Sequence, residues 1–260
     1  MTLIIGKSVA NAKQMATYLL SVNNTPKFSR EISAEEFCQL FLDVCSKENV
    51  RGDIAFAQCL KETGNLKYGG DVFYTQNNFC GLGATGGVPG CSFASIEIGI
   101  LAQAQHLKTY ATKISLNETC VDPRRTNWFV NTKGGTAPNI EQLAGTWAVP
   151  GYDTKKYASL EDANKSKDSY GYQIVSILDK ILKIKVSEPK YYRVQCGAYA
   201  LQSNAIKLQN QLKQAGFETL IKKIGFLYKV QIGAFSKKEN AKNMLKLVRD
   251  KGFNAFITYN

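Results

Sequence analysis

Histidine is almost absent from this chain of 260 residues, with His106 as its single copy. A metal site built from several histidines is therefore excluded, and a Ser-His-Asp triad would depend on His106 alone. We expect His106 to pack within a helix that begins after Ser95. The composition predicts no metal site and no cofactor.

Paired cysteines are also missing. The seven cysteines are an odd number and none lies in a C-x-x-C pair, so a zinc site is not expected and full disulfide pairing would leave one thiol over. Cys38, Cys45 and Cys59 fall in apolar helical patterns and are predicted to be core residues. Cys80 and Cys91 flank a Gly/Pro-rich loop, and the sequence leaves a bridge between them open.

No segment reaches the roughly 18 apolar residues that a membrane-spanning helix needs. The N-terminal residues Met1–Lys7 lack the charged region, the long apolar run and the cleavage site of an export signal. We therefore expect a protein that is synthesised in the cytoplasm without a signal peptide and does not insert into membranes. It would act on a substrate outside the membrane only after release.

Acidic residues are scarce toward the C-terminus. The whole chain carries 33 basic and 21 acidic residues, whereas the part from residue 187 onward carries 13 and 4, a net charge of +9 out of +12. Such asymmetry indicates that this part meets a polyanion: nucleic acid, anionic lipid or a cell wall. A basic surface that serves only solubility is the alternative.

An internal repeat defines the C-terminal part. The segment Arg193–Tyr199 (RVQCGAY) recurs as Lys229–Phe235 (KVQIGAF), and apolar helical positions and a glycine recur downstream at the same offset of 36 residues. Each copy is predicted to form strand, helix and strand. Together they predict a ferredoxin-like β-α-β-β-α-β domain over residues 191–260, with both helices on one sheet face and the other face free to bind. Residues 185–190 are predicted to be a linker.

Residues 1–184 are predicted to form a mostly α-helical domain, which makes the chain α+β overall. Helix-capping residues stand at Asn11, Ser33 and Ser95, each before apolar residues at helical spacing. We expect this domain to be helical except around residues 75–92 and 121–135, with a last helix over about residues 170–184.

Glu62 ends the apolar helical segment that begins at Ala55. A carboxyl group in an apolar setting has a raised pKa and can hold a proton near neutral pH, as the acid of a glycosidase must. A surface glutamate is the common alternative, but the C-terminal end of a helix disfavours an anion, which indicates a functional reason for this placement.

Amide and glycine residues follow Glu62 closely, at Asn65, Asn77 and Asn78 and in a loop that begins with Gly81. Amides can hold the acetamido groups of a sugar, and glycines allow the backbone to approach a ligand. Ordinary turn chemistry is the alternative for this stretch and for Asp71, which follows two glycines.

These motifs, from Lys61-Glu62-Thr63-Gly64-Asn65 through Gln76–Gly87 and Leu143–Asp153 to Tyr170-Gly171-Tyr172, resemble the bacterial glucosaminidases of glycoside hydrolase family seventy-three. The resemblance implies a lysozyme-like fold that cleaves the β-1,4 bond between N-acetylglucosamine and N-acetylmuramic acid, with Glu62 as general acid. A late tyrosine in the family contributes to the active site, and Tyr152, Tyr157 and Tyr170 all fit it. The predicted catalytic residues are Glu62, Tyr170 and Glu97. The predicted substrate-binding residues are Asn65, Asn77, Asn78, Phe79, Gly81, Trp147, Tyr152 and Tyr157.

The chain departs from the family at one informative point. Many members carry a second acid on a hairpin after the Asn-Asn pair, but residues 85–91 contain none. Glu97 is the nearest acid downstream, and its place in the first turn of a helix explains it without catalysis. Water held by Tyr and Asn groups, or the acetamido group of the substrate, could replace a second carboxylate.

The repeat resembles the SPOR domain, which binds peptidoglycan, often glycan strands without stem peptides. Its motif Val-Gln-x-Gly-Ala-aromatic stands in both copies, and the resemblance implies Gln195, Tyr199, Gln231 and Phe235 as glycan-binding candidates. The alternative is that some of them point into the core, because neighbouring strand residues face opposite sides.

The sequence therefore predicts a monomeric peptidoglycan hydrolase, an endo-β-N-acetylglucosaminidase held on glycan strands by its C-terminal domain, such as a phage or prophage endolysin. Nucleic acid is not an expected partner, because Lys229–Phe235 does not fit the motif of an RNA-recognition module. The alternatives are a muramidase or lytic transglycosylase on the same fold, a non-catalytic wall-binding protein and an RNA-binding protein.

Overall fold

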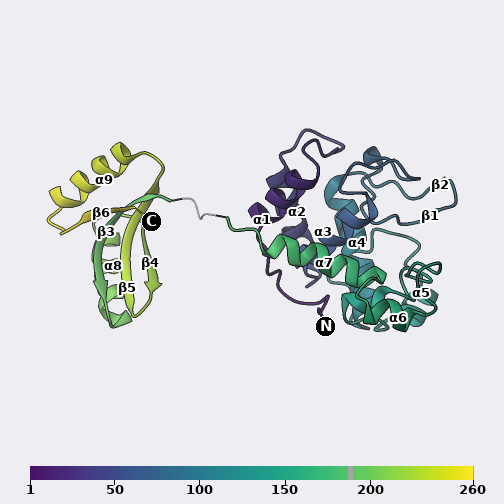
Figure 1. Cartoon of the computed structure of the whole chain (residues 1–260). Coiled ribbons are helices and arrows are strands. Elements are labelled where there is room, and N and C mark those ends of the chain that lie inside the picture. The colour runs from purple at the N-terminus through teal and green to yellow at the C-terminus, as the bar shows by residue number, and fades with distance from the viewer. Residues whose placement is uncertain (187–189, 260) are drawn as a thin grey trace. The chain divides into compact units, whose positions relative to one another are not determined.

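The computed structural model describes residues 1–186 and 190–259, which divide into a mostly helical unit, Met1–Val186, and a sheet-containing unit, Ser187–Asn260 (Figure 1). The two units are taken one at a time below. The predicted linker at residues 185–190 brackets the division, and its residues 187–189 lie outside the described part of the chain.

The first unit contains the helices α1 (Ala12–Val22), α2 (Ala34–Lys47), α3 (Gly52–Glu62), α4 (Ile96–Ala111), α5 (Asn127–Lys133), α6 (Leu160–Lys165) and α7 (Tyr170–Leu182). The predicted caps are confirmed, because the side chains of Asn11, Ser33 and Ser95 each accept a hydrogen bond from a backbone N–H in the first turn. Each bond satisfies one of the N–H groups that a helix start leaves unpaired.

Helix α3 lies in the middle of this unit, packed against α2, α4 and α7. Every residue from Gly52 to Leu60 is buried, so only the last two residues of the helix, Lys61 and Glu62, reach solvent. Beside it, the rings of Phe37, Phe41 and Phe79 contact one another edge to face. The helix that carries Glu62 therefore lies within the hydrophobic core of the unit.

A small hairpin of β1 (Ala84–Thr85) and β2 (Val88–Pro89) follows the 3₁₀ turn η1 (Tyr74–Gln76), within the stretch predicted to be non-helical. Two expectations in the first unit are wrong. Helix α5 forms inside residues 121–135, capped by Thr126. Residues 136–169 hold only α6 and the 3₁₀ turn η2 (Ile140–Leu143), where Ile140 and Leu143 are buried together because residues three apart eclipse in a 3₁₀ turn.

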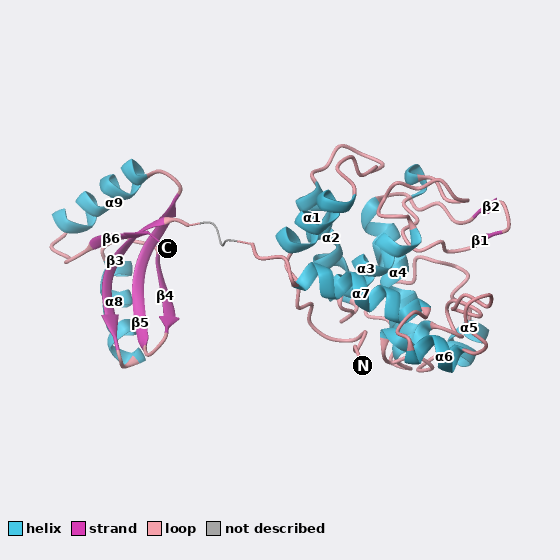
Figure 2. Cartoon of the chain, viewed as in Figure 1, coloured by secondary structure: helices cyan, strands magenta, loops and turns pink. Residues whose placement is uncertain are grey.

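The second unit is a four-stranded antiparallel sheet with strand order β4-β5-β3-β6, formed by β3 (Tyr192–Tyr199), β4 (Thr219–Ile224), β5 (Leu227–Phe235) and β6 (Phe256–Tyr259) (Figure 2). Helices α8 (Gln202–Gln214) and α9 (Lys238–Asp250) join the strands in the predicted β-α-β-β-α-β order. Leu212 of α8 and Val248 of α9 share one core with Val194 and Val230 of the sheet, so both helices cover the same face.

All seven cysteines are free thiols, including Cys80 and Cys91, so the bridge left open by the sequence is not formed. Cys38, Cys45 and Cys59 are fully buried, as predicted. None of the helices in the described ranges is both long and apolar enough to cross a membrane.

Candidate functional site

A cavity of about 540 Å³ opens at the end of α3. Its walls come from segments far apart in the sequence and include Glu62, Asp71, Asn78, Gly81, Trp147 and Tyr170. The structure thus brings one predicted catalytic acid, its predicted tyrosine partner and part of the Asn-Gly loop around one space.

Glu62 lines this cavity, and part of its surface is exposed to solvent. Burial raises the pKa of the Glu62 carboxyl group, and the hydrogen bond from Tyr170 and the positive charge of Lys61 lower it by less. The net upward shift is the property that a general acid needs near neutral pH.

The hydroxyl of Tyr170, the first residue of α7, donates a hydrogen bond to Oε1 of Glu62. Behind it lies a chain of buried amides. Nε2 of Gln58 donates to the Tyr170 hydroxyl oxygen at 3.0 Å, and Nε2 of Gln103 donates to Oε1 of Gln58 at 2.8 Å. Nε2 of Gln103 also donates to the backbone carbonyl of Ala55 at 2.9 Å.

The carbonyl at the far end fixes the direction of this chain, because a carbonyl oxygen can only accept. Gln103 must then donate from its amide nitrogen, and Gln58 must accept this bond at its amide oxygen. Gln58 then donates from its own amide nitrogen to the Tyr170 oxygen, so the hydroxyl proton of Tyr170 is directed to Glu62. Oε1 of Glu62 is thereby occupied as an acceptor. Oε2, the oxygen nearer to Gly81, accepts no hydrogen bond in the described part of the chain.

Of the three candidate tyrosines, Tyr170 is the one that contacts Glu62. Tyr157 instead donates to Asp168 at 3.0 Å, and neither Tyr157 nor Tyr152 lines the cavity. The sequence could not separate the three tyrosines, because the selection depends on α7 packing against α3 across more than 100 residues of chain.

Of the predicted amide residues, Asn78 alone lines the cavity. Its side chain is buried and clamps the loop, donating to the carbonyl oxygens of Leu82 at 2.9 Å and Cys91 at 3.1 Å. Asn77 is also buried and accepts from Ser29 at 2.5 Å, so it braces the loop from behind.

Two other predicted substrate-binding residues, Asn65 and Phe79, belong to a turn and to the core instead of the cavity wall. Asn65 lies in the turn after α3 with a positive φ of 61°, and its backbone carbonyl accepts from Asn23. Phe79 is 3% exposed and belongs to the aromatic core. Neither residue lines the cavity around Glu62.

Glu97 is not brought to Glu62. It forms an ion pair with Arg30, with 2.6 Å between Nη2 and Oε1, and Arg30 lowers the pKa of Glu97. The other carboxyl group that lines the cavity is that of Asp71, and its Oδ2 accepts from the backbone N–H of Gly87 at 3.1 Å. The hairpin has no acid of its own, but its Gly87 binds the carboxylate of Asp71 from the preceding loop.

His106 packs within α4, as expected, with 5% of its surface exposed. Its Nε2 lies 2.9 Å from Oδ2 of Asp122 and its ring meets Phe129 edge to face. In the described ranges, no group of three or more His, Cys, Asp or Glu side chains is arranged to hold a metal ion.

The sheet of the second unit carries a row of side chains on the face away from its helices. Strand pairing places Leu220, Gln231, Gln195 and Phe256 side by side on β4, β5, β3 and β6. The two glutamines are buried, with Nε2 of Gln231 donating to Oε1 of Gln195 at 3.5 Å, whereas Leu220 and Phe256 are 56% and 52% exposed. The buried Oε1 of Gln231 has no hydrogen-bond partner in the described part of the chain.

Tyr199 and Phe235, predicted to bind glycan, pack instead against the core beneath the helices. Each ring folds back over the glycine two residues before it, Gly197 and Gly233, where a Cβ atom would overlap the ring. This packing explains the Gly-Ala-aromatic part of the motif. Leu220 and Phe256 were missed, because only strand register places them beside the glutamines.

Comparison with known proteins adds three findings. Residues 188–259 match the SPOR domain family. An uncharacterized protein of Borreliella burgdorferi is 36% identical over 171 residues, which cover 63% of this chain and 80% of that protein. The solution structure of the peptidoglycan binding domain of the B. subtilis cell wall lytic enzyme CwlC is 36% identical, with 30% of this chain and 98% of that chain covered and a TM-score of 0.27.

Replacing Tyr170 with Phe tests the hydrogen bond at Glu62. The hydroxyl of Tyr170 stabilises the ionised form of Glu62 and so lowers its pKa; its loss is expected to raise that pKa further. Carboxyl ¹³C NMR titration of Glu62 measures the shift. Tyr157→Phe, which removes a hydroxyl bound to Asp168, is the matched control and should leave the Glu62 titration in place. An unchanged or lower pKa of Glu62 in the Tyr170 variant would contradict this assignment.

Proposed function

We propose that this chain, which belongs to the same family as the uncharacterized Borreliella burgdorferi protein and carries a SPOR domain over residues 188–259, is a modular peptidoglycan hydrolase. In this proposal the SPOR domain binds glycan strands and the helical unit is an endo-β-N-acetylglucosaminidase. The single observation that carries the hydrolase part is the Glu62 carboxyl group, with its raised pKa, in the wall of an open cavity.

The proposed reaction begins with proton transfer from Oε2 of Glu62 to the glycosidic oxygen. Tyr170 holds the other carboxylate oxygen and stabilises the charge that Glu62 acquires when the proton leaves. The amides of Gln58 and Gln103 keep the Tyr170 hydroxyl turned toward Glu62 through the whole step. The first unit thus supplies a positioned acid and a fixed donor to its conjugate base.

We assign to Asp71 the activation of the water molecule that attacks the sugar. Asp71 is the second carboxyl group lining the cavity, and its hydrogen bond to Gly87 holds it at the hairpin. A carboxylate there can accept a proton from water that attacks the sugar, which is the role of the base in an inverting glycosidase. This assignment gives the enzyme a pair of acids without any acid in residues 85–91.

The likeness of the motifs around Glu62 to the bacterial glucosaminidases supports N-acetylglucosamine and N-acetylmuramic acid as the sugars on either side of the cleaved bond. Trp147 lines the cavity and offers a ring for a sugar face. The proposed setting is a phage or prophage endolysin, which acts on the wall after release from the cytoplasm.

On the SPOR domain, we assign glycan binding to the row Leu220, Gln231, Gln195 and Phe256. The exposed apolar side chains of Leu220 and Phe256 can pack against sugar rings, on either side of the buried glutamine pair. The positive charge of this unit favours a wall that carries carboxylates. Binding by this domain raises the effective concentration of the catalytic unit at an insoluble substrate.

Replacing Glu62 with Gln is expected to abolish wall lysis and leave wall binding intact, because Gln keeps the size of the side chain but has no acidic proton. Turbidity clearing of a cell-wall suspension and cosedimentation with sacculi measure the two properties. Glu97→Gln is the matched control, since Glu97 pairs with Arg30 away from the cavity, and it should retain lysis. Normal lysis by the Glu62 variant would show that Glu62 is not the general acid.

Replacing Asp71 with Asn keeps an oxygen that can accept from the N–H of Gly87 but removes the base. The lysis rate is expected to fall by about 100-fold or more, within the range that one positioned acid or base contributes to a rate. Initial rates of turbidity loss, compared at equal wall-bound enzyme, measure the change. A rate within twofold of the parent would show that Asp71 does not activate the water molecule.

Replacing Phe256 with Ala is expected to weaken binding to sacculi by about tenfold, equivalent to about 1.4 kcal/mol. Cosedimentation over a range of sacculus concentrations measures the affinity. Phe226→Ala is the control, because Phe226 is 94% exposed in the turn between β4 and β5, outside the row. Equal losses in the two variants would contradict the assignment of the row as the binding surface.

A further inference from the structure

A second cavity, of about 250 Å³, adjoins the one that contains Glu62. Cys80, Gly81 and Trp147 line both spaces, so the two cavities share part of their walls. A substituent of a polymer seated against Glu62 can therefore extend toward the second cavity. The proposed reaction does not use this space.

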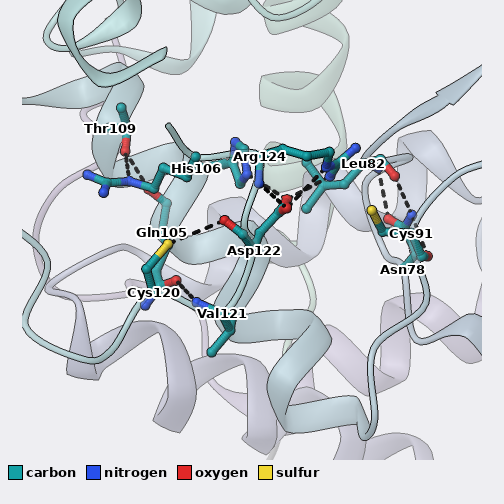
Figure 3. A network of polar contacts seen from close by, with 11 residues as sticks. Asn78, Leu82, Cys91, Gln105, His106, Thr109, Cys120, Val121, Asp122 and Arg124 are labelled. Atoms are coloured by element: carbon teal, nitrogen blue, oxygen red, sulfur yellow. Dashed lines mark hydrogen bonds and ion pairs between the residues drawn. The ribbon is translucent and has the colours of Figure 1, made fainter. Parts of the chain in front are cut away.

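Arg124 is the positively charged group of this cavity, and its orientation is fixed. Its Nε and Nη2 donate to the two oxygens of Asp122 at 3.0 and 2.6 Å, and its backbone N–H donates to Oδ1 at 3.0 Å. Nε2 of His106 contacts the same carboxylate at 2.9 Å, so Asp122 is itself held in place (Figure 3). Burial alone would raise the pKa of Asp122, but the hydrogen bonds from His106 and Arg124 outweigh burial and lower it, so Asp122 stays ionised.

Nη1 of Arg124 has no hydrogen-bond partner among the residues that the structure describes. It lies over Gly83, where a Cβ atom would overlap it. The buried Asp122 carboxylate, with 1% of its surface exposed, does not line the cavity, so the charged side chain that a ligand meets there is Arg124. A guanidinium with a free N–H and a fixed orientation is suited to a carboxylate.

The rest of the wall is aromatic. Tyr110 lies between the rings of Phe129 and Trp147, with centroids 5.6 and 5.4 Å away, and His106 meets Phe129 at 5.0 Å. The cavity therefore combines an apolar lining with one cationic donor, which fits a small group that has both a methyl group and a carboxylate.

We propose that this second cavity recognises the lactyl ether of an N-acetylmuramic acid residue, with Nη1 of Arg124 donating to the lactyl carboxylate and the aromatic side chains contacting its methyl group. The inference rests on the proposed function, because it names a substituent of the same glycan. It assigns a preference for muramic acid residues whose lactyl group is free, as on strands without stem peptides.

Two monosaccharides that differ only in this group provide the test. N-acetylmuramic acid carries the lactyl ether, and N-acetylglucosamine has a hydroxyl group in its place. Trp147 lines both cavities, and the other tryptophan, Trp128, is 70% exposed on α5. In the full chain with Trp128→Phe, fluorescence then reports on Trp147 alone, and no tryptophan lies in the SPOR domain.

We expect N-acetylmuramic acid to bind roughly tenfold to a hundredfold more tightly than N-acetylglucosamine at matched ionic strength, the scale of one charge-assisted hydrogen bond. Arg124→Gln should remove the preference. Arg125→Gln is the matched control, because Arg125 donates to Thr109 at 2.6 Å and does not line the cavity. It should keep the preference.

Equal affinity for the two sugars in the parent chain would overturn the proposal without use of any variant. An equal loss of preference in the Arg124 and Arg125 variants would also overturn it. The titration needs no turnover, so failure of the lactyl preference is distinguishable from failure of the proposed hydrolase, which appears as absence of wall lysis.

Discussion

The hydrogen bond from Tyr170 to Glu62 is the contact on which the candidate site depends. It joins the start of α7 to the end of α3, and the amides of Gln58 and Gln103 behind it have their direction set by one backbone carbonyl. Because these groups are buried, each has few alternative hydrogen-bond partners. The orientation of the Glu62 carboxyl group, the proposed acid, thus follows from the packing of α3, α4 and α7.

The sequence predicted local features of the first unit more successfully than its assembly. The caps at Asn11, Ser33 and Ser95 depend on side chains within a few residues, and all are present. The partners of Glu62 depend on helices more than 40 and 100 residues away, so Gln103 was not recognised and Tyr170 was one of three candidates. The sequence left the place of Asp71 open between a cleft and an ordinary turn, because its hydrogen bond to Gly87 forms only when the two loops meet.

In the second unit the repeat predicted the strand and helix order, since each copy carries its own turn and helix signals. The direction of individual side chains was harder to predict. Register shifts in β3 alter which face a residue occupies, so Tyr199 packs beneath the helices while Gln195 lies on the opposite face. Phe256 and Leu220 join the glutamines through pairing with β6 and β4, which no single strand reveals.

The proposal combines a glycan-binding SPOR domain with a helical unit in which Glu62 as acid and Asp71 as base cleave the glycan. Mass analysis of reduced fragments after complete digestion of purified peptidoglycan tests its central claim most directly. The account predicts fragments that end in reduced N-acetylglucosamine. Fragments ending in reduced muramic acid or in anhydromuramic acid would contradict it and indicate a muramidase or a lytic transglycosylase.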